Sequence, residues 1–194
     1  MKRKISYTAA TGTLALLTAC GGNDMTGQDG RSGGAATTSV APSVVFNDAD
    51  VMFTQMMIPH HEQAVEMAGL APSRASDIEV TELAEKIKVS QEPEIQTMKG
   101  WLTAWNKPEM SSHVGHEMPG LISEEAMEQL RKAKGKKFDK LFARHMIVHH
   151  NGAIEMVRTQ EAEGSDPKVK KVATHMATHQ RDEVAQLQTI VERL

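Results

Sequence analysis

The sequence of 194 residues is poor in cysteine and in aromatic residues, with one cysteine and 4% Phe, Trp and Tyr. A single cysteine cannot form a disulfide within the chain, so no such crosslink supports the fold. No stretch alternates between apolar and polar residues at a period of two, which argues against a half-buried β-sheet. Basic residues are outnumbered, at 22 Lys and Arg against 25 Asp and Glu. This balance argues against nucleic-acid binding, which requires a basic surface.

The apolar stretch near the start of the chain is also too short to span a bilayer. Residues 5–19 fall below the roughly 20 residues that a spanning helix needs, but they suit a secretory signal peptide behind Lys2, Arg3 and Lys4. The stretch ends in Leu-Thr-Ala-Cys, which resembles a bacterial lipobox. The resemblance implies that residues 1–19 are removed and that lipid is attached to Cys20. We therefore expect an exported protein, anchored to the outer face of the cytoplasmic membrane or found in the periplasm or outer membrane.

Residues 20–46 are rich in Gly, Ser, Thr, Ala and Asp, and we expect a flexible tether there. Removal of the three leader cations leaves 19 basic residues against 25 acidic ones, a formal charge of −6. Residues 47–194 are dominated by Ala, Glu, Lys, Met and Gln, which favour helices. This part of the chain is long enough for one domain with a hydrophobic core.

The folded region contains an internal duplication with an offset of 89 residues. Phe53–Met67 and Phe142–Met156 are identical at 8 of 15 positions. The two copies, about 47–105 and 138–194, are each predicted to form a helix, a short turn and a second, longer helix. Asp77 and Asp166 are expected N-caps, and Gly69 and Gly164 are expected helix ends. Two such hairpins predict an all-α four-helix bundle, with a polar loop and one short helix in residues 106–137.

Each copy contains an adjacent pair of histidines, His60 with His61 and His149 with His150. Because a helix turns by about 100° per residue, adjacent side chains cannot share one face. We therefore place the first histidine of each pair in the core-facing stripe and the second at the seam with a neighbouring helix. The same stripe carries Met56 and Met67 in the first copy and His145 and Met156 in the second, while Met57 and Met146 flank it.

Histidine and methionine recur four residues apart, a spacing that lets two side chains of one helix bind one metal ion. Thioethers select Cu(I) and imidazoles suit Cu(II), so copper is the expected ion; zinc is the alternative because imidazole and carboxylate also bind it. The candidate metal-binding residues are Met56, Met57, His60, His61, Met67, His145, Met146, His149, His150, Met156, His175 and His179. Met52, Met98 and Met127 are interpreted as core residues instead.

The second helix of each hairpin carries polar residues within its apolar stripe. These are Gln91 and Glu94 in the first copy and Gln180 and Glu183 in the second. A buried charge is costly unless it is paired. We expect the glutamates to accept hydrogen bonds from histidines of the preceding helix and so to orient the rings toward a metal. Direct ligation by a carboxylate is the alternative.

The connecting loop adds four soft or borderline metal donors within nine residues, namely Met110, His113, His116 and Met118. They could bind Cu(I) or pass ions to the bundle. The alternative is a solvated loop that carries them without a metal.

Three sequence blocks resemble a known family. MPGLISEEAMEQLRKAKGKKFDKLFARHMIVHHNGAIEM resembles the signature of the CopM-like proteins (domain of unknown function 305), and MFTQMMIPHHEQAVEMA and SQEPEIQTMKGWL match its other blocks. The likeness covers about residues 47–194 and implies a ferritin-like four-helix fold with extracytoplasmic copper binding linked to copper tolerance. The matching positions are Met56, Met57, His60, His61, Met67, Met146, His149, His150 and Met156. His145 departs from the first copy, which has Met56 there, and this departure favours a harder second site.

The leading hypothesis is a lipid-tethered copper-binding protein that sequesters the ion or passes it to a copper-handling partner. The second hypothesis is a structural or partner-binding bundle without a metal. A di-iron oxidase requires Glu-x-x-His on two helices, and no histidine here is preceded by glutamate at that spacing. Nucleophilic catalysis has no obvious candidate either, because the only cysteine is expected to carry lipid and no serine lies in a recognisable nucleophile elbow. We therefore expect no enzyme activity.

Overall fold

The computed structural model describes residues 45–110 and 118–194. The expected signal peptide, Cys20 and nearly all of the tether lie outside the described residues, as do the loop candidates His113 and His116. The described part contains five helices and no strand. The helices are α1 (Asp48–Arg74), α2 (Ile78–Ala104), α3 (Glu124–Lys132), α4 (Lys136–Glu163) and α5 (Pro167–Arg193). The predicted all-α class is therefore confirmed.

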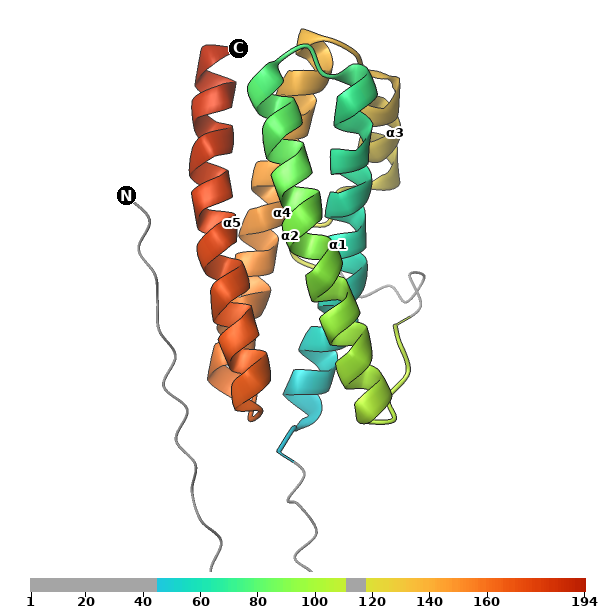
Figure 1. Ribbon diagram of the computed structural model, residues 1–194, viewed down its shortest axis with the longest axis vertical. Coiled ribbons are helices and arrows are strands. Elements are labelled where there is room, and N and C mark those ends of the chain that lie inside the picture. Colours follow the sequence, from blue (N-terminus) through green and yellow to red (C-terminus); the bar gives the residue numbers. More distant parts are fainter. Residues whose placement is uncertain (1–44, 111–117) are drawn as a thin grey trace, which may run out of the picture. The chain divides into compact units, whose positions relative to one another are not determined.

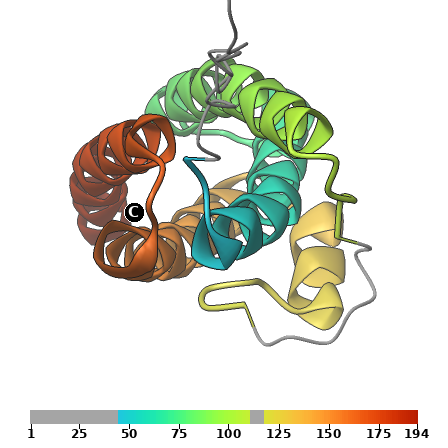
Figure 2. The same cartoon turned by 90° about the horizontal axis from the view of Figure 1, so that it is seen from below.

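Four long helices form a bundle, and the short helix α3 lies outside it (Figures 1 and 2). α1 packs along α2, and α4 packs along α5, so each copy of the duplication forms one helical hairpin. The two hairpins are joined mainly through α1 and α4. This is the predicted four-helix bundle of two hairpins. Across the described residues, no helix is both long and apolar enough to cross a membrane.

The helix ends follow the capping pattern of the sequence, with one exception. Asp77 and Asp166 cap α2 and α5 by accepting hydrogen bonds from the backbone N–H groups of Glu79 and Lys168, at 2.9 and 2.8 Å. Gly164 ends α4 as expected. Gly69 does not end α1, because the helix continues through the buried Ala71 as far as Arg74.

The lengths of the helices also correct one expectation. With α1 extended to Arg74, α1 and α2 both have 27 residues, and α4 and α5 have 28 and 27. The second helix of each hairpin is therefore not the longer one. Pro59 and Pro93 lie inside helices that run without interruption.

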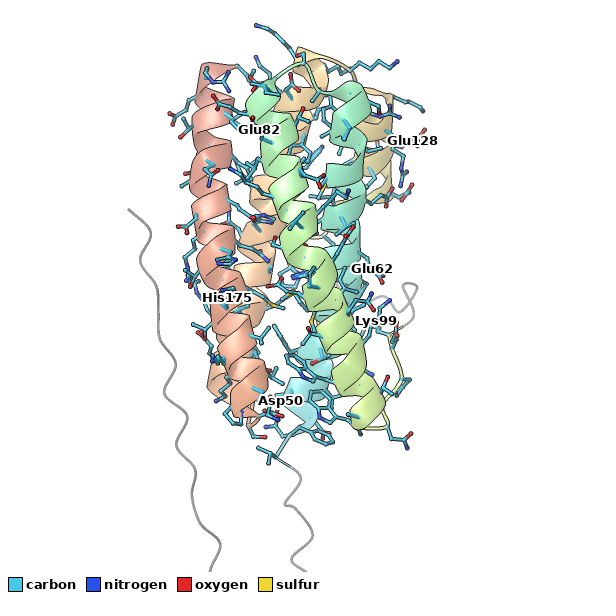
Figure 3. The ribbon with its side chains drawn as sticks, viewed as in Figure 1. Asp50, Glu62, Glu82, Lys99, Glu128 and His175 are labelled. Atoms are coloured by element: carbon cyan, nitrogen blue, oxygen red, sulfur yellow. The ribbon has the colours of Figure 1, made fainter. Side chains whose placement is uncertain are left out.

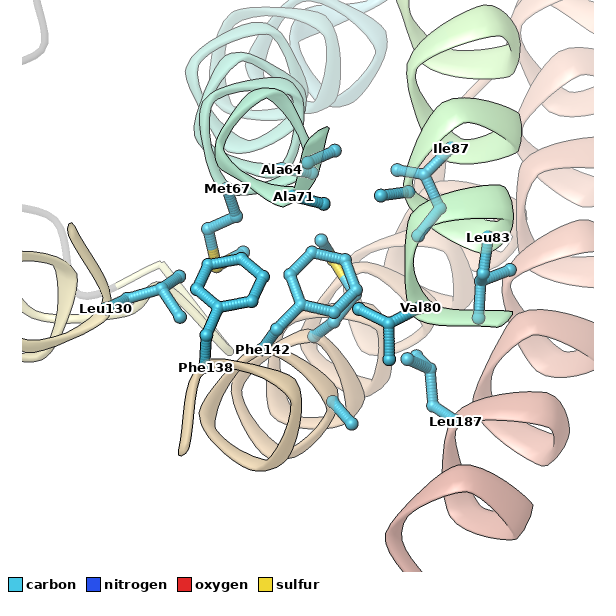
Figure 4. Close-up of a cluster of buried hydrophobic side chains, with 14 of the residues drawn as sticks. Ala64, Met67, Ala71, Val80, Leu83, Ile87, Leu130, Phe138, Phe142 and Leu187 are labelled. Atoms are coloured by element: carbon cyan, nitrogen blue, oxygen red, sulfur yellow. The ribbon is translucent and has the colours of Figure 1, made fainter. Parts of the chain in front are cut away.

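The hydrophobic core is divided into two clusters along the bundle axis. One cluster is centred on Phe138 and Phe142, which pack against Met67 and Leu187 (Figure 4). The other contains Phe53, Leu102 and Met176. In every long helix a short polar stretch separates the residues of one cluster from those of the other. We call this set the polar layer; it consists of His60, His61, Gln91, Glu94, His149, His150, Gln180 and Glu183.

Two buried aspartates tie each hairpin to the turn of the other hairpin. Asp50 of α1 accepts hydrogen bonds from the backbone N–H groups of Ser165 and Asp166, both at 3.0 Å. Asp139 of α4 accepts one from the backbone N–H of Ser76 at 3.1 Å. Asp50 and Asp139 are 89 residues apart, as are Ser76 and Ser165. The duplication therefore extends to the contacts that hold the two copies together.

Candidate metal centre

The four histidines of the two pairs all lie in the polar layer and are almost fully buried. His60, His61 and His150 are 0% exposed and His149 is 1% exposed. Histidines are usually only intermediate in burial, so four buried rings at one level of a bundle form an unusual cluster. α1 and α4 supply the rings, while α2 and α5 supply the glutamates that contact His61 and His150 and the buried Gln91 and Gln180.

Each hairpin pairs its second histidine with its own glutamate. Nε2 of His61 lies 2.9 Å from Oε2 of Glu94, and Nε2 of His150 lies 2.7 Å from Oε2 of Glu183. A carboxylate only accepts hydrogen bonds, so Nε2 is the nitrogen that donates in both pairs. This hydrogen bond fixes the orientation of the ring and leaves Nδ1 as the nitrogen that could bind a metal, as in the carboxylate–histidine pairs that orient metal ligands.

The first histidines of the two pairs meet across the centre of the bundle. The ring centroids of His60 and His149 are 3.8 Å apart, with a tilt of 41° between the ring planes. Nε2 of His60 also donates to the carbonyl oxygen of Pro119 at 3.1 Å. Because a carbonyl can only accept, the proton of a neutral His60 ring lies on Nε2 and its Nδ1 carries a lone pair.

Burial keeps these two central rings neutral. Burial, followed by the neighbouring His61, lowers the pKa of His60 to about 3. Burial and then the neighbouring His60 hold the pKa of His149 well below its usual value. A neutral imidazole is the form that binds metal ions. Both central rings therefore have an unprotonated nitrogen available at neutral pH.

The polar layer contains more buried polar atoms than the described residues satisfy. Each such atom costs about 1–3 kcal/mol when it is left without a partner. Within residues 45–110 and 118–194, no hydrogen-bond partner is present for Nδ1 of His60, His61, His149 and His150, for Nε2 of His149, for both amide atoms of Gln91, and for Oε1 of Gln180. The layer thus offers several lone pairs and amide groups to a bound ion or to water.

The donor set suits an ion that accepts nitrogen and sulfur. In the described residues, no three or more His, Cys, Asp or Glu side chains are grouped closely enough to hold a metal ion between them. Imidazoles with neighbouring thioethers remain as the available donors, which is the set that copper favours. The unpartnered imidazole nitrogens therefore fit copper better than an ion that needs several carboxylates.

The structure corrects the predicted faces of the methionines. Met57 was expected beside the core-facing stripe but is 0% exposed, whereas Met56, expected in the stripe, is only partly buried. His61 and His150, predicted at the seam with a neighbouring helix, contact Glu94 of α2 and Glu183 of α5 and are fully buried there. The inward face of α1 is wide because the helix has neighbours on two sides. On one side, Glu94 of α2 contacts His61. On the other side, the carbonyl of Pro119 contacts His60.

The buried methionines lie on both sides of the polar layer. Met57 and Met156 belong to one hydrophobic cluster, and Met67 and Met146 belong to the other. Met57 and Met146 stand one helical turn before His61 and His150. They are therefore the methionines whose sequence spacing brings them nearest to the second histidine of each pair.

A surface pocket of about 200 Å³ is lined by residues of α1 and α4 and by Pro119, and it contains a methionine that was interpreted above as a core residue. Met52, Met56 and Met156 line it together with Pro119. Met52 is 57% exposed, so the interpretation of this residue as core was wrong, whereas Met98 and Met127 are buried as expected. The signal for Met52 was present in the sequence, since it precedes Met56 by four residues.

The remaining candidates lie outside the layer. His145 is partly buried one turn before His149, and burial lowers its pKa. His175 and His179 are exposed on α5, with Figure 3 marking His175 on its lower half. Met110 and Met118 border the loop and are partly buried.

Comparison with known proteins gives a family match and several structural neighbours. Residues 50–191 match the family described as domain of unknown function (DUF305). A predicted secreted protein of this family from Streptomyces coelicolor is 30% identical, with a TM-score of 0.70 over 75% of this chain and 93% of that chain. A DUF305 fragment from Deinococcus radiodurans is 29% identical, with a TM-score of 0.70 over 76% of this chain and 98% of that chain. A comparison with curated proteins finds no match.

A third neighbour was solved with copper. CopM in its Cu(II)-bound form is 32% identical, with a TM-score of 0.65, and the alignment covers 74% of this chain and 96% of that chain. CopM in the Cu(I)-bound form and in silver-bound forms is similar to this chain as well. The family match extends over more than half of the sequence and includes every residue of the polar layer. The chain therefore belongs to the DUF305 family, as its sequence blocks predicted.

Proposed function

We propose that this protein binds copper in the polar layer, outside the cytoplasm, to sequester the ion, to confer tolerance or to deliver it to a copper-handling partner. The observation that carries the proposal is the pair of neutral, buried rings of His60 and His149, 3.8 Å apart, with unpartnered nitrogens. The similarity to copper-bound CopM supports it. The lipobox-like ending at Cys20 supports an exported protein anchored by lipid.

Each part of the layer has a role in this proposal. His60 and His149 are the central ligands, with the lone pair of the His60 Nδ1 directed away from Pro119. Glu94 and Glu183 hold His61 and His150 in place through their Nε2 hydrogen bonds. The thioethers of Met57 and Met146 supply soft donors one turn away, which favours Cu(I) over harder ions. Gln91 and Gln180 line the same layer.

Anaerobic titration of the purified mature protein with Cu(I), in competition with a chromophoric chelator, tests the proposal. The double variant His60→Ala with His149→Ala is expected to bind Cu(I) at least about 100-fold more weakly, which corresponds to about 2.7 kcal/mol. Met57→Leu with Met146→Leu keeps the apolar volume of the core and removes only the thioethers. It is expected to weaken Cu(I) binding while leaving the melting temperature nearly unchanged.

Three results would contradict the proposal or favour another function. Unchanged Cu(I) affinity in the histidine double variant, with a cooperative melting transition, would remove the polar layer as the site. An unaltered melting temperature of the wild type on addition of copper, zinc or nickel would favour a structural or partner-binding bundle. Tighter binding of zinc than of Cu(I) under the same conditions would favour the zinc alternative.

A further inference from the structure

A third pair of histidines lies on the outside of the bundle and does not belong to the polar layer. His175 and His179 are both exposed and stand one turn apart on α5. Their ring centroids are 4.0 Å apart, and their planes are inclined by 57°. Neither residue belongs to the duplicated pattern, since the matching positions of the first copy are Lys86 and Ser90.

The backbone that carries these rings is held firmly. α5 runs without interruption from Pro167 to Arg193. Between the two histidines, Met176 and Ala177 are each 1% exposed and pack into the core. One turn of helix anchored in this way fixes the separation of the two histidine Cα atoms, so binding of one ion by both rings orders only the two side chains and not the backbone.

The separation of the rings indicates which ion geometry the pair can hold. A metal bound at about 2.0 Å from one nitrogen of each ring lies about 3.2 Å from each ring centre. When one nitrogen of each ring points at the metal, ring centres 4.0 Å apart subtend an angle of about 80° there, on the order of the 90° between neighbouring positions of a tetragonal ion. A tetrahedral ion such as zinc needs an angle of about 109°, and hence more widely spaced rings.

We propose that His175 and His179 form a surface site for Cu(II), separate from the buried site. The two imidazoles occupy adjacent positions in the plane of a tetragonal ion, and water fills the others. Nitrogen donors bind Cu(II) most tightly among the divalent first-row metals, and tetragonal geometry with nitrogen and oxygen donors is typical of Cu(II). The exposed site takes the oxidised ion directly from solution, whereas the buried layer offers soft thioethers as well.

Cu(II) titration followed by continuous-wave EPR tests this site, with excess glycine as a competing ligand to suppress weak binding. The double variant His175→Ala with His179→Ala is expected to bind one Cu(II) fewer per chain and to lose the nitrogen hyperfine pattern of that ion. A single His175→Ala change should weaken this binding at least tenfold, because the chelate is lost. His113 and His116 of the connecting loop are present in every variant, so they do not affect the difference in Cu(II) stoichiometry between the variants and the wild type.

Two controls separate this proposal from the buried site. Gln188→Ala with Glu192→Ala alters two exposed residues of α5 at the same spacing and should bind as much Cu(II) as the wild type. His60→Ala with His149→Ala should retain the surface ion whatever its effect on Cu(I). The proposal is overturned if the His175/His179 double variant keeps the full Cu(II) stoichiometry, or if the His60/His149 variant binds no Cu(II).

Discussion

At the scale of single residues, His60 and His149 are defined by what surrounds them. Each ring is buried, each stays neutral, and each retains a nitrogen without a partner among the described residues. Two adjacent imidazoles would serve as ordinary core residues if their nitrogens were satisfied. The nitrogens that lack partners among the described residues instead lower the stability of the core when no ligand is bound.

The low pKa values predict that the metal-free protein loses stability as the pH falls below about 6.5. In the unfolded chain both rings take up protons near pH 6.5, whereas the folded His60 ring stays neutral until about pH 3. The unfolded state then binds more protons, so the free energy of unfolding falls by up to about 1.4 kcal/mol per pH unit for each ring. Above pH 6.5 both states are neutral and this dependence disappears.

Urea unfolding of the metal-free protein between about pH 7 and pH 5 measures this slope. A His60→Leu variant, which cannot titrate at that position, should show a smaller slope over the same range. If the slope of the variant equals that of the wild type, His60 does not titrate as the structure indicates.

At the scale of elements, the segment after the loop packs against α4 without room for side chains. A Cβ atom added at Gly120 would lie 2.7 Å from the carbonyl oxygen of Val148, and one added at Gly152 would overlap the carbonyl of Pro119. Gly120 also has a φ of 79°, a conformation that favours glycine. Two glycines thus let the carbonyl of Pro119 reach His60.

Gly152→Ala is therefore expected to destabilise the protein by about 1–3 kcal/mol, because the added methyl displaces the Pro119 segment. Gly100→Ala is the matched control, since nothing lies within 4 Å of its added Cβ and alanine favours the helix. The control should keep or raise the melting temperature. Equal melting temperatures for the two variants would show that the segment is not packed against α4 as described.

The sequence predicted the elements better than it predicted their faces. The duplication, the N-caps at Asp77 and Asp166 and the four-helix bundle could all be read from it. The full burial of Met57 could not, because helical periodicity assumes one contact face and α1 has contacts on two sides. The contact between His60 and Pro119 joins residues 59 positions apart, and no local pattern indicates it.

At the scale of the whole molecule, the 89-residue duplication produces a bundle of two hairpins, and each hairpin is hydrogen-bonded to the turn of the other. Asp50 contacts the turn of the second hairpin and Asp139 contacts the turn of the first (Figure 3 labels Asp50). Burial opposes the ionisation of Asp50, but hydrogen bonds from Asn47, Ser165, Gln160 and Asp166 together hold the pKa of its carboxyl below the usual value. The polar layer lies between these two anchored ends.

Asp50→Ala is expected to lower the free energy of unfolding by at least about 2 kcal/mol, since it leaves the backbone N–H groups of Ser165 and Asp166 without their acceptor. Asp48→Ala removes an exposed acidic residue from the same first turn of α1 and should cost no more than about 1 kcal/mol. Chemical denaturation of both variants provides the comparison. Equal losses would mean that Asp50 acts only through the helix dipole.

The central claim is that copper binds between the two hairpins at the paired histidines. Diffraction from copper-loaded crystals, recorded on both sides of the copper absorption edge, tests it most directly because anomalous differences locate the metal without reference to the protein. We predict a copper peak within about 2 Å of a ring nitrogen of His60 or His149, lost in the His60→Ala with His149→Ala variant. Copper peaks confined to His175, His179 or other surface residues, with none in the polar layer, would contradict the claim.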